Sequence, residues 1–98
     1  MRIEILPQAK EDLLFAYRFY QDRSPGLGTY FIDSVFSDIG SLVHSAGIHR
    51  VVYGSHRCLA KRFPFSIHYK IDGETVRVIA VLDCRRDPTW IRRRLRGS

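Results

Sequence analysis

Cysteine is scarce in this sequence, and so are patterns that bind metals. The two cysteines, Cys58 and Cys84, lie in different segments, without a CxxC motif or a Cys/His ligand spacing. A structural zinc site needs closely spaced thiolates and imidazoles, so the sequence argues against one and predicts no metal and no cofactor. We expect both cysteines to be small buried thiols without a disulfide.

Long apolar runs are also missing. No stretch approaches the roughly 20 apolar residues of a membrane-spanning helix, and the N-terminal MRIEILPQ lacks the apolar stretch of a signal peptide. The chain has 98 residues, enough for one hydrophobic core but not for two. The sequence therefore predicts one cytoplasmic domain, residues 1–98, with no membrane partner.

Lysine is scarce as well. Of 16 basic residues three are lysine and thirteen are arginine, and the net charge is +6. A GC-rich genome would explain this ratio but not the clustering, because residues 83–98 hold six arginines against two aspartates. The planar guanidinium binds phosphates and carboxylates through two hydrogen bonds. The candidate partners are therefore nucleic acid or an acidic protein surface.

The N-terminal third predicts a strand and a helix. Arg2–Leu6 reads RIEIL, which alternates and is β-branched as short strands are. Apolar residues recur at helical spacing over Ala9–Asp22, and Phe15 and Phe19 widen the apolar face. This helix should end at Ser24.

A second helix is expected directly after the first. Ser24 and Pro25 have the order of an N-cap followed by proline at the first helical position. The apolar stripe then continues to about His44. Two apolar-faced helices joined by a short turn predict an αα-hairpin.

The second half of the chain predicts β-structure. Val51–Tyr53 and Arg57–Phe63 are candidate strands, separate or continuous. Residues alternate over Phe65–Asp72, which is typical of a half-buried strand, and Asp72-Gly73 favours a hairpin turn. Thr75–Leu82 is apolar on both faces, which predicts a central strand covered on both sides.

The C-terminus predicts a short helix over Pro88–Arg96, with Asp87 as its N-cap. We expect Trp90, Ile91 and Leu95 to pack this helix on the sheet. The element order is β-αα-βββ-α, which predicts an α+β domain with one twisted sheet, in which the strands after the helical hairpin are antiparallel.

Four segments of the chain are informative when they are taken together and in sequence order: AKEDLLFAYRFY, SPGLGTYF, KRFPFSIHYKID and VRVIAVLDCRRDPTW. Together they resemble the RelE/ParE superfamily of toxins from type II toxin–antitoxin systems, over nearly the whole chain. The resemblance implies a RelE/ParE-like fold. It also implies neutralisation by a cognate antitoxin, small and acidic, whose extended or helical segment wraps the toxin in a hetero-oligomer.

The superfamily contains two kinds of toxin. Ribosome-dependent members are metal-independent mRNA endonucleases with Lys and Arg on the central sheet and an Arg and often a Tyr near the C-terminus. ParE-like members lack this set and act on DNA gyrase. RNA cleavage needs a base, an acid and cations, and here Trp90 replaces the Tyr and Asp83 stands where many relatives have His. The resemblance therefore implies a ParE-like gyrase inhibitor, of the kind linked to plasmid stabilization; the alternatives are an mRNA endonuclease and an inactive homologue that only binds antitoxin.

Candidate site residues follow from the resemblance and from the charge clusters. For an endonuclease the catalytic candidates are Lys61, Arg62, Arg85 and Arg86. For binding to the target or the antitoxin the candidates are Arg57, Lys61, Arg62, Arg85, Arg86, Arg93 and Arg94. Arg85 and Arg86 have an alternative role in a local ion-pair network with the neighbouring aspartates. We expect the arginines of the last helix and the four histidines, His44, His49, His56 and His68, to face solvent.

Overall fold

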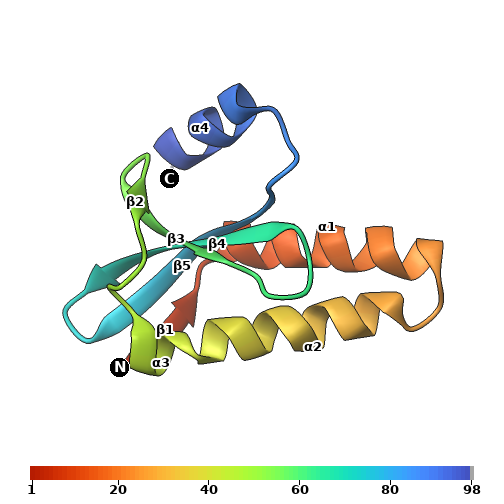
Figure 1. Cartoon of the computed structure of the whole chain (residues 1–98), viewed down its shortest axis with the longest axis horizontal. Helices are drawn as coiled ribbons and strands as arrows, with labels where there is room; N and C mark the ends of the chain where they lie inside the picture. Colours follow the sequence, from red (N-terminus) through yellow and green to blue (C-terminus); the bar gives the residue numbers. More distant parts are fainter. Residues whose placement is uncertain (98) are drawn as a thin grey trace.

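The structure is a computed structural model that describes residues 1–97. It contains five strands and four helices in one chain (Figure 1). Their bounds are β1 Arg2–Ile5, α1 Pro7–Arg23, α2 Leu27–Gly40, α3 Leu42–Ser45, β2 Val51–Val52, β3 Ser55–Leu59, β4 Phe65–Asp72, β5 Thr75–Asp83 and α4 Pro88–Arg96. The predicted α+β class, the αα-hairpin and the C-terminal helix are confirmed.

The strands form one sheet in the order β1-β5-β4-β3-β2, in which β1 is parallel to β5 and the other pairs are antiparallel. The hairpin of α1 and α2 covers one face and α4 the other (Figure 1). Val76, Val78 and Val81 of β5 lie in the core under the hairpin, whereas Ile79 and Leu82 pack with Leu95 under α4. The prediction that β5 is a central strand covered on both sides is therefore confirmed.

The junction between α1 and α2 differs from the prediction. Ser24 ends α1 as expected, but Gly26, with φ 91°, is the residue before α2. The Gln21 side chain accepts hydrogen bonds from the backbone N–H groups of Gly26 (3.2 Å) and Gly28 (3.0 Å). A Cβ at Gly28 would lie 2.6 Å from the Tyr17 carbonyl oxygen, so only glycine lets the two helices approach this closely. Gln21 thus performs the capping that was assigned to Ser24.

The second helix is shorter than predicted. It ends at Gly40, and a separate turn of helix, α3, continues to Ser45. The Ser41 hydroxyl donates a 2.6 Å hydrogen bond to the Asp38 carbonyl at this break. Local competition of serine for backbone groups is a common reason for such an interruption.

The two candidate strands after Gly47 are separate. Tyr53 (φ 53°) and Gly54 (φ 86°) form a tight turn between β2 and β3, because both residues have the positive φ that such hairpin turns require. β3 ends at Leu59, so Lys61 and Arg62, which fall within the predicted strand Arg57–Phe63, lie beyond the strand.

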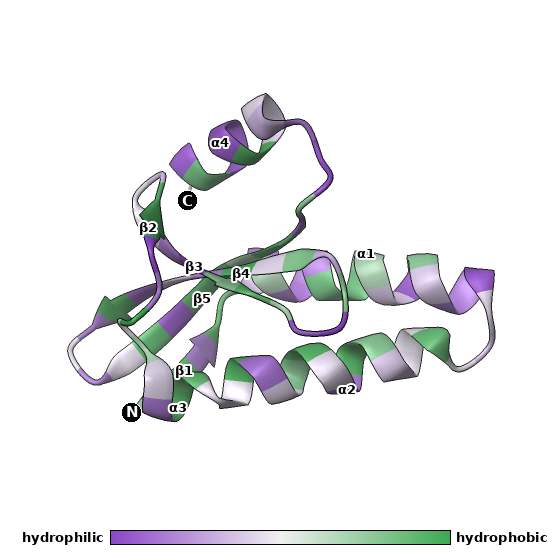
Figure 2. Ribbon diagram, in the orientation of Figure 1, coloured by the Kyte–Doolittle hydropathy of each residue, from purple (hydrophilic) through white to green (hydrophobic). Residues whose placement is uncertain are grey.

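The connection after β5 and the helix α4 differ in their hydropathy patterns. Hydrophilic residues dominate the connection after β5, and hydrophobic and hydrophilic residues alternate along α4 (Figure 2). The Asp87 carboxylate accepts the Thr89 N–H at 2.9 Å, which confirms the predicted cap. Both cysteines are free, but Cys84 in this connection is exposed, because the sheet has ended there; only Cys58 is buried as expected.

Candidate functional site

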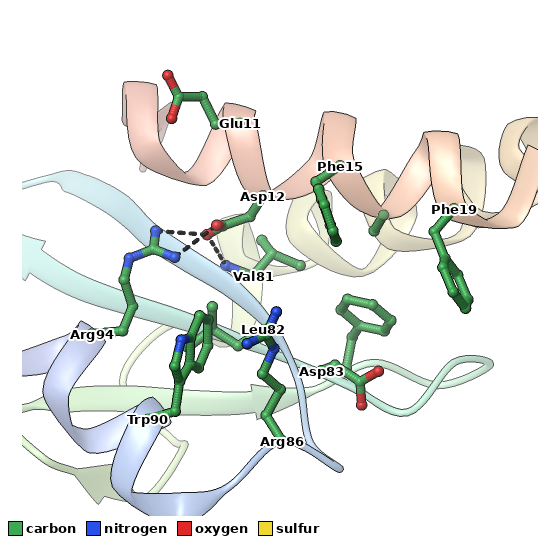
Figure 3. Close-up of a pocket in the computed structure, with 12 residues that line it drawn as sticks. Glu11, Asp12, Phe15, Phe19, Val81, Leu82, Asp83, Arg86, Trp90 and Arg94 are labelled. Atoms are coloured by element: carbon green, nitrogen blue, oxygen red, sulfur yellow. Dashed lines mark hydrogen bonds and ion pairs between the residues drawn. The ribbon is translucent and has the colours of Figure 1, made fainter.

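A groove runs between α1 and α4 over the end of β5, with a volume of about 560 Å³; we call it the α1–α4 groove. Phe15 and Phe19 project from α1 on one side, and Trp90 and Arg86 lie on the other (Figure 3). Phe15 is 70% exposed and Phe19 42% exposed, although both are large and apolar. The interpretation that they extend the core-facing side of α1 is wrong: they form an apolar wall open to solvent.

Asp12 ties the two sides of the groove together. Its carboxylate accepts two hydrogen bonds from the Arg94 guanidinium, at 2.7 and 2.8 Å, and a third from the Val81 N–H at 3.0 Å (Figure 3). The side chains of Arg94 and Asp12 are only 17% and 14% exposed. The expectation that Arg94 faces solvent is therefore wrong, because the guanidinium reaches back to α1. The last residue of β1, Ile5, pairs with Val78 of β5. Asp12 accepts the Val81 N–H beyond this point, where β1 no longer lies beside β5.

Trp90 packs on the sheet as predicted, but it is only partly buried. It contacts the cluster of Ile79, Leu82 and Leu95, in which Leu95 is the deeply buried member of α4. The guanidinium of Arg86 lies 3.9 Å from the Trp90 ring centroid, a cation–π contact. Such a contact contributes about 0.5–1 kcal/mol at an exposed site. The pair forms the rim of the α1–α4 groove.

Arg85 confirms the local ion-pair alternative. Its guanidinium donates to both carboxylate oxygens of Asp83, at 3.0 and 2.7 Å, and its N–H donates to the same carboxylate at 2.8 Å. The Arg85 hydrogen bond holds the pKa of Asp83 below its ordinary value, and Asp83 in turn raises the pKa of Arg85. Arg85 is thus neutralised locally, whereas Arg93 stays exposed on the outer side of α4.

A smaller pocket of about 200 Å³ lies beneath α4 and brings together Tyr53, Arg57, His68 and Arg86. Of the four endonuclease candidates only Arg86 lines this pocket. Arg85 pairs with Asp83, and Lys61 and Arg62 are exposed residues after β3. The predicted cationic set is therefore dispersed over several surfaces.

His68 is buried, contrary to prediction. It is 1% exposed, and its Nε2 lies 2.7 Å from the Ser66 hydroxyl. The alternation of β4 does place His68 on the face away from the hairpin, but α4 covers that face. Burial, with a smaller effect of Arg57 and Arg94, lowers the pKa of His68 to about 4. The imidazole is thus neutral at physiological pH. His49 and His56 also have partners, at the Tyr69 side chain.

The His68 environment predicts a loss of stability in acid. A folded pKa of about 4 against an ordinary 6.5 means that the unfolded chain takes up the proton first as pH falls. Stability is complete above pH 6.5 and declines toward about pH 4, by about 3 kcal/mol. Urea unfolding over this range should show a smaller acid loss for His68→Leu than for the wild type. His44→Leu removes an exposed imidazole and is the matched control; an unchanged acid slope in His68→Leu would contradict the assignment.

Little in the sequence indicates that Asp12, Phe15 and Phe19 form a groove. One signal was present: α1 carries more apolar residues than a single buried stripe can use, and the surplus includes Leu14 as well as the two phenylalanines. None of the helices within residues 1–97 is long and apolar enough to cross a membrane.

The structure is an α+β domain with an exposed apolar groove between α1 and α4. Comparison with known protein-family models gives no match, and neither does comparison with curated proteins. Among solved structures, the chain is similar to a chain of the "Chromosomal ParDE TA system from P. aeruginosa". The identity is 21%, the TM-score is 0.73, and the match covers 83% of this chain and 92% of that one. The likeness confirms the predicted fold.

Proposed function

We propose that this chain is the toxin of a type II toxin–antitoxin system, of the ParE kind. It would act in the cytoplasm by binding DNA gyrase or a related topoisomerase, and a cognate antitoxin would neutralise it. The fold shared with a chain of a ParDE system supports the proposal. The observation that carries it is the exposed apolar wall of the α1–α4 groove.

Exposed large apolar side chains that line a groove mark a surface for a partner. Phe15 and Phe19 offer apolar contacts on one side of the groove, and Trp90 offers an aromatic contact on the other. A volume of about 560 Å³ suits the apolar side chains of one bound helix or extended segment. We assign this groove to the antitoxin, whose acidic character would complement the net charge of +6.

The geometry beneath α4 favours binding over catalysis. A general base works best with a pKa near the operating pH, and burial lowers the pKa of His68 to about 4. Asp83 is held as a carboxylate by Arg85 and so accepts no further proton readily. Arg57 and Arg86 supply positive charge at this pocket. These features support a toxin that acts by binding its target.

An mRNA endonuclease is the second candidate, because Arg57, Arg86, Tyr53 and His68 do line one pocket. Expression without antitoxin separates the two candidates. We expect growth arrest with DNA damage signalling and intact mRNA, and inhibition of gyrase supercoiling by the purified protein. Codon-phased mRNA cleavage on ribosomes would instead establish the endonuclease. Normal growth, with antitoxin binding retained, would identify an inactive homologue.

A further inference from the structure

We propose that two copies of this chain associate through β1, whose free edge pairs antiparallel with β1 of the second copy. β1 is an end strand of the sheet, and in the part of the chain that the structure describes it pairs with β5 alone. No residue of β1 lines the α1–α4 groove. The inference therefore goes beyond the proposed function and does not depend on the antitoxin assignment.

The outer edge of β1 offers main-chain hydrogen-bonding groups at two positions. Arg2 and Leu6 donate their backbone N–H groups to carbonyl oxygens on the β5 side, at 2.8 and 3.0 Å. Successive residues of a strand turn their backbone groups toward opposite edges, so the N–H and C=O groups of Ile3 and Ile5 point away from β5. An open edge of this kind is a template for a further strand.

Residues 1–5 of the chain, MRIEI, are complementary to themselves when read in the opposite direction. A two-fold axis at Ile3 would place Ile3 opposite Ile3 of the second copy. Arg2 would then lie opposite Glu4, and Met1 opposite Ile5, twice in each dimer. In this register the outward N–H and C=O groups of Ile3 form a hydrogen-bonded antiparallel pair. The direction of the backbone groups and the order of the side chains therefore favour the same pairing.

Both faces of the paired strands are matched. Ile3 and Ile5 pack against the core under the helical hairpin but are only partly buried, so a second strand would cover them further. Arg2 and Glu4 project from the opposite face and are exposed. Arg2 forms no salt bridge within residues 1–97, and the pair of Glu4 with Arg77 is long, at 3.6 Å. Opposite charges that face each other across antiparallel strands attract.

Other arrangements of two β1 strands fit less well. A parallel pair in register would place Arg2 beside Arg2, and like charges in this position repel. A two-fold axis at Ile5 would bring Ile3 opposite Pro7, which lacks an N–H and begins α1. The antiparallel pair centred on Ile3 also forms a closed dimer, as most homo-oligomers do. Because its interface is small, we expect a weak and reversible dimer.

Sedimentation velocity of the purified full chain, measured from about 1 μM to about 1 mM, tests the proposal. We expect a reversible shift toward twice the monomer mass as the concentration rises. Arg2→Glu and Glu4→Arg should each weaken dimerisation by about tenfold or more, because two opposite-charge pairs become like-charge pairs. A mixture of these two variants should associate again, since each reversed charge then faces its opposite. The double variant Arg2→Glu/Glu4→Arg should dimerise as the wild type does.

Asp33→Arg on α2 is the matched control, because it makes the same change of charge as Glu4→Arg at an exposed acid outside β1. It should dimerise as the wild type does. Hydrogen exchange locates the interface: the Ile3 and Ile5 amides should exchange about tenfold more slowly, or slower still, in the dimer.

Three results would overturn the proposal: a chain that stays monomeric up to about 1 mM, charge-reversed variants that do not associate when mixed, or a loss for Asp33→Arg as large as that for Glu4→Arg. Slow exchange at Ile3 and Ile5 that requires a different protein would assign this edge to a strand of that partner and would also exclude self-pairing.

Discussion

Replacing Asp12 with alanine should lower the free energy of unfolding by about 3–5 kcal/mol, the usual result of removing one partner from a buried ion pair. The carboxylate holds Arg94 of α4 through two hydrogen bonds and also accepts the Val81 N–H of β5. The substitution would leave a nearly buried guanidinium without its carboxylate and a backbone donor without its acceptor. Urea unfolding of wild type and Asp12→Ala measures the loss.

Glu11→Ala is the natural control, because Glu11 precedes Asp12 on the same helix but is exposed. Its effect should stay within about 0.5 kcal/mol, as for most surface changes. Arg94→Ala should also destabilise, and the double variant Asp12→Ala/Arg94→Ala should lose less than the sum of the two single losses, because the two residues interact directly. Equal losses for Asp12→Ala and Glu11→Ala would show that the ion pair contributes no net stability.

The Asp12–Arg94 pair also sets the position of α4. Among the apolar residues of α4, Leu95 is deeply buried, whereas Trp90 and Ile91 are only partly buried. A chain without the ion pair would keep the apolar contacts of α4 but lose its direct tie to α1. The shape of the α1–α4 groove therefore depends on a contact between residues 82 positions apart in the sequence.

This distance explains what the sequence could and could not predict. The α4 bounds were predictable because Asp87 and Pro88 act on their own helix through local cap chemistry. The burial of Arg94 was not, because it depends on where α1 lies after folding. The burial of His68 likewise depends on α4 crossing the outer face of the sheet, which the alternation of β4 does not encode. The Arg85–Asp83 pair was predictable as an alternative because its partners are two residues apart.

The candidate site shows the same division. The basic candidates were found from their clustering, but the structure distributes them between the Arg85–Asp83 and Arg94–Asp12 ion pairs, the pocket beneath α4, the exposed segment after β3 and the solvent-facing side of α4. The apolar wall of the groove could not be separated from the core by periodicity alone, because Phe15 and Phe19 continue the helical apolar pattern of α1. Only the folded position of α4 shows that Phe15 and Phe19 stay exposed on α1.

Phe15→Ala should weaken binding of the cognate antitoxin by about 2 kcal/mol or more, roughly 30-fold in Kd, with the fold intact. Phe15 is 70% exposed, so its truncation removes little buried area from the folded chain but removes an apolar contact from the α1–α4 groove. Calorimetric titration with the cognate antitoxin, to be sought as a small acidic protein encoded beside this chain, would give both dissociation constants, and thermal unfolding of the free chains would verify their stability.

Phe36→Ala is the matched control for this prediction. Phe36 is also an exposed phenylalanine, at 45%, but it lies on α2 and does not line the groove. Its truncation should leave the affinity within a few tenths of a kcal/mol of the wild type, as for near-neutral surface positions. If Phe36→Ala weakens the complex and Phe15→Ala does not, the antitoxin binds along the outer face of the hairpin. The assignment of the α1–α4 groove to the antitoxin would then be wrong.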